Sequence, residues 1–367
     1  MPFIDLQRQY QKYKDEIHAQ METVLNASAY IMGPKMKELE ETLSGYVGVK
    51  HALAVSSGTD ALLISLMALG IKAGDEVITS AFSFFASCEV ISFLNAKPVF
   101  VDIDPVTYNI NPDQIESKIT KNTKAIMPVS LYGQCADFEK INSIGRKYDL
   151  PVIEDACQSF GATCAKGRSC GLSSLGCTSF FPSKPLGCYG DGGMIFTNDS
   201  SLAEKMYMIR AHGQKERYRH DCIGVNGRLD ALQAAVLLGK WPHFEEEVRL
   251  RNQLGQELKE ELKKIMGVIV PETASGNSHV YAQFSIQVES RDAFAASLQK
   301  MGVPTAVHYP VPLPFQPVYE SMGFKKGDFP VSEDVAGRII SLPFHPFLTQ
   351  EERHFIVSCV QQALSLV

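Results

Sequence analysis

Short apolar runs alternate with segments of helical periodicity between residues 50 and 200. The runs read HALAV, EVITS, PVFVDI, KAIMPV and PVIED, and the segments between them include TDALLISLMALG, SFFASCEVISFLN and DFEKINSIGRKY. Near-continuous apolar strands that alternate with helices are typical of a mostly parallel sheet covered by helices on both faces. The pattern therefore predicts an α/β domain, whose ligands bind beyond the carboxyl ends of the strands.

A helical stretch from about residue 229 to residue 262 leads to a second unit. That unit reads as a strand VYAQFSIQV, a helix RDAFAASLQKM, an irregular segment VHYPVPLPFQPVY and a closing helix EERHFIVSCVQQALSL. We predict a large α/β domain over residues 1–245, which includes an N-terminal helix, and a small α+β domain over residues 246–367.

The composition narrows the possible functions. The 367 residues are 45% hydrophobic, and 35 basic against 41 acidic residues give a net charge of -6. With no basic cluster, nucleic acid is not an expected partner. The N-terminus turns polar after six residues and so lacks the apolar core of a signal peptide, and no apolar run has the length of a membrane span. We therefore expect a cytoplasmic protein without membrane contact. The nine cysteines form no CxxC pair, so neither a metal site nor a disulfide is expected.

Lys184 lies in SFFPSKPLGCYGDGGM, between aromatic residues and a glycine-rich segment. Pro182 and Pro185 hold the backbone extended after an apolar strand at 177–181. Only a neutral amine attacks a carbonyl, and partial burial lowers the pKa of a lysine toward neutrality. Taken alone, Lys184 is compatible with an ordinary loop lysine, but the setting suits a lysine that forms a Schiff base.

Two further motifs follow strands at the same predicted edge of the sheet. SSGTDALL begins a helix at 56–63, where free N–H groups near Gly58 and Thr59 suit a phosphate, although simple helix capping also explains these residues. Asp155 ends the strand PVIED and either caps a helix or pairs with a cation such as a protonated pyridine nitrogen. The segment GCYGDGG lacks the spacing of a dinucleotide-binding loop.

Four motifs occur in a fixed order along the chain: SSGTDALL, EDACQSFGA, SFFPSKPLGCYGDGG and GVNGRLDALQAA. In this order and spacing they resemble the DegT and StrS type sugar aminotransferases, pyridoxal-phosphate enzymes of fold type I. The resemblance runs from FIDLQRQY near the start to SLPFHPFL near the end. The stretches SLYGQCADF and TAVHYPVPL are similar to those of bacterial members that aminate C3 of UDP-2-acetamido-3-keto-glucuronic acid.

The resemblance implies a role for each matching residue. Lys184 would bind pyridoxal 5'-phosphate as a Schiff base and carry the proton, and Asp155 would bind the pyridinium nitrogen. The other cofactor contacts would be Gln158 at the ring hydroxyl, Phe84 on the ring, Gly58, Thr59 and Ser179 at the phosphate, and Asn226 of a neighbouring subunit. The substrate contacts would be Tyr30, Ser183, Arg228, His308 and Tyr309, with Arg228 and His308 supplying positive charge. Lysine at position 184 favours amino transfer, since relatives with histidine there dehydrate.

The implied reaction is a ping-pong transamination in a homodimer with sites at its interface. L-glutamate would leave as 2-oxoglutarate, and the keto group of a UDP-sugar would accept the amine, in the synthesis of cell-surface polysaccharide such as O-antigen. A 4-keto or dTDP-3-keto sugar nucleotide is an alternative substrate, and a cofactor-binding regulatory protein without turnover is an alternative class. Each of three residues also has a structural alternative. Phe84 could pack in the core, Arg228 could form an ion pair with Asp230 or another acid, and His308 could be a loop histidine with its hydrogen bonds satisfied.

Overall fold

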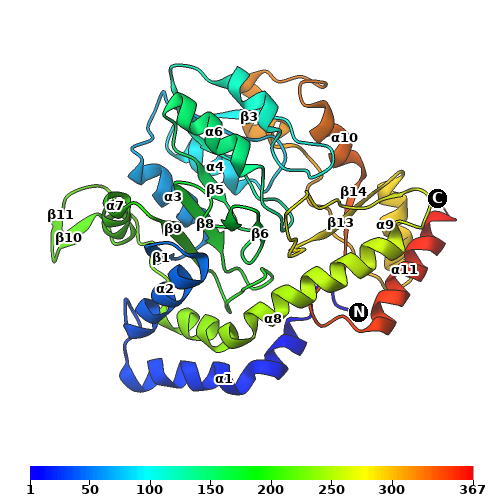
Figure 1. Ribbon diagram of the computed structural model, residues 1–367, viewed down its shortest axis with the longest axis horizontal. Coiled ribbons are helices and arrows are strands. Elements are labelled where there is room, and N and C mark those ends of the chain that lie inside the picture. Colours follow the sequence, from blue (N-terminus) through cyan, green and yellow to red (C-terminus); the bar gives the residue numbers. More distant parts are fainter. Residues whose placement is uncertain (367) are drawn as a thin grey trace.

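A twisted sheet forms the centre of the computed structural model, which describes residues 1–366 (Figure 1). Its strands are β1 (His51–Val55), β2 (Glu76–Ser80), β3 (Lys97–Val101), β4 (Thr123–Met127), β5 (Ile153–Asp155), β8 (Leu175–Ser179) and β9 (Gly193–Thr197). The order β1-β9-β8-β5 continues through bridges between β5 and the end of β4 into β4-β2-β3. The pairings are parallel except for β9, which is antiparallel to β1 and β8. The predicted mostly parallel α/β sheet is confirmed.

Helices cover both faces of the sheet because successive strand residues point to opposite sides. Leu53 and Val55 pack with α3 and α7, whereas Ala52 and Ala54 pack with α2 and α8. Farther along the sheet, Ile126 packs with α6 on the second face. These helices and their smaller neighbours are α2 (Pro34–Val47), α3 (Gly58–Ala68), α4 (Ala86–Phe93), α5 (Pro112–Ile115), α6 (Phe138–Tyr148), α7 (Ser200–Arg210) and α8 (Ala231–Leu262).

The long helix α8 connects the two ends of the molecule, running along the base of Figure 1 beside α1 (Leu6–Ala27). The two helices approach closely at Gly239, where a Cβ would lie 2.6 Å from the Cα of Ile17. Because α8 continues through Pro242 without interruption, the domain boundary predicted near residue 245 falls inside one helix. That boundary stays a prediction.

The C-terminal unit is a three-stranded antiparallel sheet with helices, as expected for a small α+β unit. It contains β12 (Val268–Ile269), β13 (Phe284–Val288), β14 (Ile339–Leu342), α9 (Arg291–Lys300), α10 (Pro330–Arg338) and α11 (Gln350–Leu364). We did not predict α10 or β14. The segment expected to be irregular forms two 3-10 helices, Leu313–Phe315 and Pro317–Met322. Its Tyr319 packs edge-on against Phe100 of the large unit, as does Phe329 directly before α10.

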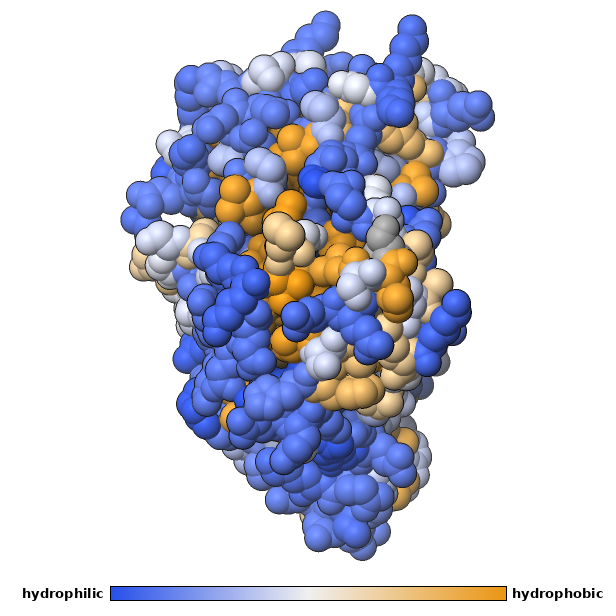
Figure 2. All heavy atoms as spheres, turned by 90° about the vertical axis from the view of Figure 1, so that its right-hand side faces the viewer, coloured by the Kyte–Doolittle hydropathy of each residue, from blue (hydrophilic) through white to orange (hydrophobic). Residues whose placement is uncertain are grey.

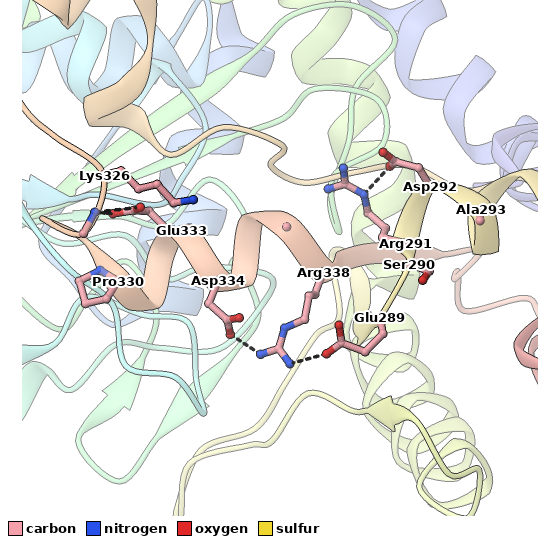
Figure 3. A pocket seen from close by; sticks show the side chains of 12 residues that line it. Glu289, Ser290, Arg291, Asp292, Ala293, Lys326, Pro330, Glu333, Asp334 and Arg338 are labelled. Carbon is pink, nitrogen blue, oxygen red and sulfur yellow. Dashed lines mark hydrogen bonds and ion pairs between the residues drawn. The ribbon is translucent and has the colours of Figure 1, made fainter. Parts of the chain in front are cut away.

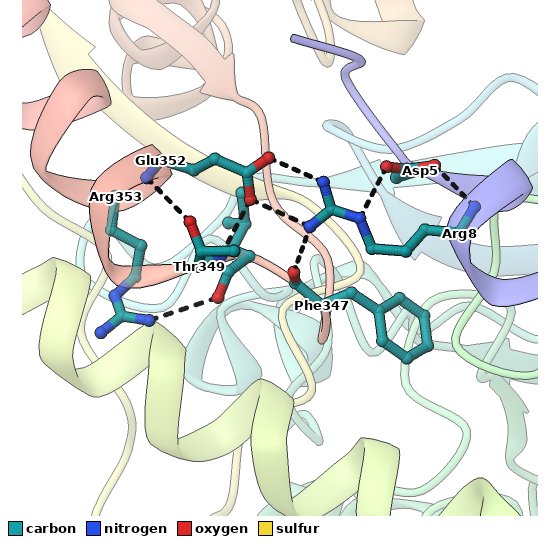
Figure 4. Close-up of polar contacts among 7 residues, drawn as sticks. Asp5, Arg8, Phe347, Thr349, Glu352 and Arg353 are labelled. Atoms are coloured by element: carbon teal, nitrogen blue, oxygen red, sulfur yellow. Dashed lines mark hydrogen bonds and ion pairs between the residues drawn. The ribbon is translucent and has the colours of Figure 1, made fainter. Parts of the chain in front are cut away.

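Arg8 joins the start of the chain to its end (Figure 4). Its guanidinium donates to the Phe347 carbonyl at 2.6 Å and pairs with Glu352 at 2.8 Å and with Asp5 at 3.1 Å. Glu352 also completes the capping box of α11 with Thr349. One carboxylate therefore fixes both the N-terminal segment and the first turn of the last helix.

Two surface hollows lie away from the ends of the central strands. One of about 750 Å³ lies between α9 and α10, where Arg338 pairs with both Asp334 and Glu289 (Figure 3). The other, between the end of α8 and α11, is lined partly by Ile265 and Met266, and apolar side chains gather on that side of the molecule (Figure 2). Among residues 1–366, no helix combines the length and the apolar character that crossing a membrane requires.

A 3-10 helix at Glu116–Lys118 and two short hairpins complete the described secondary structure. The hairpins are β6 (Thr163–Cys164) with β7 (Gly167–Arg168), and β10 (Gln214–Glu216) with β11 (Arg219–His220). The second hairpin projects from the body of the molecule beyond α7 (Figure 1).

Candidate active site

A cavity of about 470 Å³ opens at the carboxyl ends of β5 and β8, beside the first turn of α3. Its size is typical of a small-molecule site. Most of the predicted site residues line it: Gly58, Thr59, Phe84, Asp155, Gln158, Ser179, Ser183, Lys184, His308 and Tyr309. Strands and loops that are distant in sequence therefore meet here, as expected for an α/β sheet.

Lys184 reaches the cavity from a tight turn after β8. Its backbone N–H donates to the Phe181 carbonyl at 2.8 Å, which fixes the turn between the two prolines. Burial lowers the pKa of the Lys184 amine from its ordinary value, while nearby Cys157 and Asp155 oppose this shift. The amine is therefore more readily neutral than that of an exposed lysine, as a nucleophile requires.

Asp155 presents its carboxylate at the end of β5. Its Oδ2 accepts a hydrogen bond from the Ser87 hydroxyl at 2.8 Å, and its Oδ1 accepts one from the Cys157 backbone N–H at 3.2 Å. Ser83 contacts the Ser87 hydroxyl at 3.1 Å. Two donors therefore hold this buried carboxylate in one orientation.

Gln158 is oriented by its own hydrogen bonds. Its Oε1 accepts from the Tyr132 backbone N–H at 2.8 Å, and its Nε2 donates to the Tyr309 hydroxyl at 3.0 Å. Tyr132 in turn donates its hydroxyl hydrogen to the His308 carbonyl. The amide NH2 group therefore faces the cavity side, where it can donate to a bound oxygen.

His308 is held by a hydrogen bond between its Nδ1 and the Ser341 hydroxyl at 2.8 Å. Burial, followed by the nearby Lys184 charge, lowers the pKa of His308 to about 4. Since the imidazole is then neutral at pH 7, the expectation that His308 supplies positive charge is wrong. It contributes hydrogen bonds instead.

The opposite end of the cavity is built around the start of α3. Ser57 caps the helix by accepting from the Asp60 N–H at 3.0 Å, and the N–H groups of the first turn have no partner within the helix. A Cβ on Gly58 would lie 2.7 Å from the Ser179 Cβ and 2.8 Å from the Cys157 Sγ. Only glycine therefore lets the start of the helix approach β8 closely. The same helix start has both a side-chain cap and free N–H groups that can bind an anion.

Phe84 projects from the loop before α4 and is 55% exposed, so packing in the core is not its role. Its ring centroid lies 6.1 Å from that of Tyr309. The two rings border the cavity as an aromatic wall.

Three predicted contacts do not line the cavity of a single chain: Tyr30, Asn226 and Arg228. Residues 226–228 run beside the end of β1, where Arg228 bridges Val55. Tyr30, between α1 and α2, lies beside the start of α8, where its carbonyl accepts from the Ala231 N–H at 3.0 Å. Within residues 1–366 the Arg228 Nε is buried without a hydrogen-bond partner.

Sequence reasoning missed several residues that line the cavity. They include Ser83, Val129, Cys157, Phe181, Asp191 and Gln283. Cys157 lies in the motif EDACQSFGA and Asp191 in the segment GCYGDGG. Their closeness in sequence to Asp155 and Lys184 is a signal from which a place at the cavity could be predicted. Gln283 comes from the segment before β13, far away in sequence, and nothing local marks it.

The donor set fits pyridoxal phosphate. Unpaired helix N–H groups and hydroxyls suit its phosphate, an oriented carboxylate suits a protonated ring nitrogen, aromatic side chains suit its ring, and a lysine with a lowered pKa suits its aldehyde. Within residues 1–366 no cluster of three or more His, Cys, Asp or Glu side chains could hold a metal ion.

Comparisons with known proteins agree with this geometry. The family model described as "DegT/DnrJ/EryC1/StrS aminotransferase family" matches residues 11–361. The chain is 52% identical to UDP-2-acetamido-2-deoxy-3-oxo-D-glucuronate aminotransferase of Pseudomonas aeruginosa, over 94% of this chain and 95% of that protein. It is 44% identical to a pleiotropic regulatory protein of Geobacillus stearothermophilus, covering 99% of this chain and 98% of the relative.

A solved structure shows the same fold. NtdA from Bacillus subtilis, determined with bound cofactor PMP, superposes with a TM-score of 0.91 at 31% identity, covering 100% of this chain and 85% of that one. The match extends over both units, including the segment that returns to the large unit. This chain therefore belongs to the DegT/DnrJ/EryC1/StrS aminotransferase family.

Proposed function

We propose that this aminotransferase uses pyridoxal phosphate to move the amino group of L-glutamate to the C3 keto group of a UDP-linked 2-acetamido-3-keto sugar. The 3-keto glucuronate sugar is the proposed acceptor because the Pseudomonas relative, 52% identical, is named for it. The observation that carries the chemistry is the convergence of Lys184, Asp155 and the start of α3 on one cavity.

The residues divide the work according to their positions. When bound, pyridoxal phosphate supplies an electron sink for the carbon that loses its proton. The Asp155 carboxylate, held by Ser87 and the Cys157 N–H, binds the ring nitrogen and keeps it protonated. The N–H groups of Gly58 and Thr59, with the Ser179 hydroxyl, bind the phosphate.

Lys184 and its neighbours manage the proton and the ring. The Lys184 Nζ, whose pKa burial lowers, accepts the proton from the substrate carbon and returns it during transfer. The Gln158 Nε2 donates to the ring hydroxyl, and Phe84 covers the ring. Ser183, His308 and Tyr309 contact the sugar nucleotide by hydrogen bonds.

We place the active unit in a homodimer in which Tyr30, Asn226 and Arg228 act at an interface site. The support is that these three residues lie outside the single-chain cavity, and that Tyr30, Ile31 and Met32 form a run of exposed large side chains. Sedimentation of the loaded enzyme tests this arrangement, since a stable monomer that retains cofactor contradicts it. We further propose that the enzyme acts in the cytoplasm and that its product is a precursor of cell-surface polysaccharide.

The donor half-reaction gives the first test. Addition of L-glutamate to the purified enzyme should change the visible absorbance of the cofactor and release 2-oxoglutarate. Lys184→Ala should retain cofactor noncovalently but abolish turnover, whereas the exposed control Lys37→Ala should not. Normal turnover in Lys184→Ala contradicts the assignment.

The acceptor is tested separately. Glutamate-treated enzyme is offered 3-keto and 4-keto sugars linked to UDP or dTDP, and recovery of the original absorbance reports amino transfer. The proposal expects the fastest recovery with the UDP-linked 3-keto glucuronate. A faster 4-keto or dTDP-linked sugar reassigns the substrate. No recovery with any sugar, together with no response to glutamate, favours a regulatory protein, which the name of the Geobacillus relative raises as the second candidate.

A further inference from the structure

Two cysteines meet at a cavity that the proposed reaction does not use. This cavity, of about 360 Å³, lies beside the β6–β7 hairpin and the loop after β4, and both Cys135 and Cys164 line it. They also belong to one apolar cluster. Neither cysteine is in a disulfide.

One short segment, residues 277–278, connects the backbone at Cys135 with the backbone next to Cys164. The Asn277 Nδ2 donates to the Cys135 carbonyl at 3.0 Å. The next residue, Ser278, donates its N–H to the Thr163 carbonyl at 2.8 Å and accepts from the Thr163 N–H at 2.8 Å. Because consecutive residues bind the backbone of Cys135 and of Thr163, the chain segments that carry the two cysteines lie next to each other.

The two thiols have different surroundings. Cys135 is buried at 2% exposure, whereas Cys164 is partly exposed at the beginning of the hairpin turn. The neighbouring Cys135 thiol, together with the N–H groups of Lys166 and Gly167, lowers the pKa of Cys164 to about 6, although burial opposes this. The neighbouring Cys164 thiol and burial together raise the pKa of Cys135 well above its ordinary value.

The charges around the cavity are mixed and largely paired. Lys166 pairs with Glu139 at 3.3 Å and Lys140 with Asp113 at 3.0 Å. The ionisable groups that line the cavity besides the cysteines are Asp104, Asp113, Asp137, Glu139, Lys140 and Lys166. Lys166 is the cation whose charge acts on Cys164. A partly exposed thiolate beside a lysine and turn N–H groups is the usual setting of a reactive cysteine.

We propose that Cys164 and Cys135 form a reversible redox site, in which Cys164 attacks a hydroperoxide and Cys135 resolves the product into an intramolecular disulfide. The Cys164 thiolate attacks one peroxide oxygen, the O–O bond breaks, and the leaving oxygen takes a proton to become water or an alcohol. The resulting sulfenic acid is attacked by the Cys135 sulfur, which loses its proton as hydroxide leaves, and the two combine as water. The pair of thiols is oxidised by two electrons, and the peroxide is reduced.

The position of this site connects it to the active-site cavity. The loop after β4 carries both Tyr132 and Cys135, and the chain from Asp155 to Cys164 carries Gln158. The hydrogen bond from the Tyr132 N–H to the Gln158 Oε1 already joins these segments. A disulfide between Cys135 and Cys164 would join these two segments a second time. It would thereby restrict the movement of the loop whose Tyr132 N–H orients the Gln158 amide.

The test uses the full-length holoenzyme with Cys222→Ser, which removes an exposed thiol that would compete for oxidant. Brief treatment with hydrogen peroxide, alkylation of the remaining thiols and peptide mass spectrometry should reveal one linked pair, Cys135 with Cys164, that dithiothreitol reverses. Cys170, which is buried with a raised pKa, serves as the internal control and should remain reduced.

Two single variants distinguish a designed pair from incidental oxidation. In Cys135→Ser, Cys164 should proceed to sulfinic acid because no resolving thiol is present; in Cys164→Ser, Cys135 should remain reduced. Without peroxide, the alkylation rate of Cys164 should stay high as the pH is lowered and should reach half of its high-pH value only near pH 6, because Cys164 has a pKa of about 6. The proposal is overturned if both thiols remain alkylatable after peroxide, or if Cys164 over-oxidises while Cys135 is present. These readouts do not depend on aminotransferase activity.

Discussion

A buried ion pair beneath β1 gives a prediction whose size the structure sets. The Arg210 guanidinium, 1% exposed, contacts the Glu40 carboxylate at 2.5 Å and donates to the Ala54 carbonyl at 2.8 Å. The same carboxylate accepts from the Ala54 N–H at 2.8 Å. The pair therefore links α2, α7 and β1, the strand that leads directly to the start of α3 and the phosphate end of the site.

Replacing Arg210 by methionine should leave Glu40 buried without its cation. Removing one partner of a buried ion pair costs about 3–5 kcal/mol of stability. With an unfolding entropy of about 2.1 cal/mol/K per residue over 367 residues, the melting temperature should fall by about 4–6 °C. The double variant Arg210→Met with Glu40→Gln should recover at least half of this loss, because no buried charge remains.

The pH dependence identifies the cause. Burial raises the pKa of Glu40 even in the native protein, while Arg210 opposes the shift, so the folded pKa is higher still in Arg210→Met. A raised folded carboxyl pKa costs stability as pH rises above the unfolded pKa, and the cost disappears when the group is protonated in both states. The loss in Arg210→Met should therefore be larger at pH 8 than at pH 5.

Differential scanning calorimetry at both pH values measures these effects. Arg249→Met is the matched control, because its ion pair with Glu246 is exposed and should contribute little. An equal fall in melting temperature at pH 5 and pH 8, or a double variant as unstable as the single one, would refute the reasoning.

Two further predictions concern the site. Asp155→Asn should slow the donor half-reaction about 10²–10³-fold, the usual range for losing one preorganised electrostatic contact. Ser87→Ala, which removes only one donor to Asp155, should have a smaller effect. An unchanged single-turnover rate for Asp155→Asn contradicts the role. Gly58→Ala should weaken cofactor binding at least about tenfold, because the added Cβ would lie 2.7 Å from the Ser179 Cβ. Gly45→Ala is the control, since a Cβ there has nothing within 4 Å. Equal cofactor affinities in titrations of the two variants would show that the close approach is unimportant.

Local patterns were sufficient for the central elements. HALAV and EVITS coincide with β1 and β2 because each is a short apolar run ended by polar residues. The helix over 58–68 was expected from its periodicity and its capping residues. Since ligand sites of such sheets lie at the strand ends, the positions of Lys184 and Asp155 in the cavity were predictable without any long-range contact.

Other features depend on contacts between distant segments. The segment with the two 3-10 helices carries no periodic signal, and the packing of its Tyr319 on Phe100 is a tertiary contact. The role of Gln283 at the cavity, and the neutral state of His308, likewise depend on what surrounds them after folding.

The sequence by itself determined the α/β architecture, the order of the strand-end motifs and the family, because these depend on hydrophobic period and on short motifs. The tertiary structure decided which side chains share a cavity and which protonation states they take. It placed Tyr30, Asn226 and Arg228 outside the single-chain cavity, and it brought Cys135 and Cys164 together without any CxxC spacing. The physical reason is that burial and hydrogen bonding, which set pKa values and reactivity, arise from contacts between residues far apart in the chain.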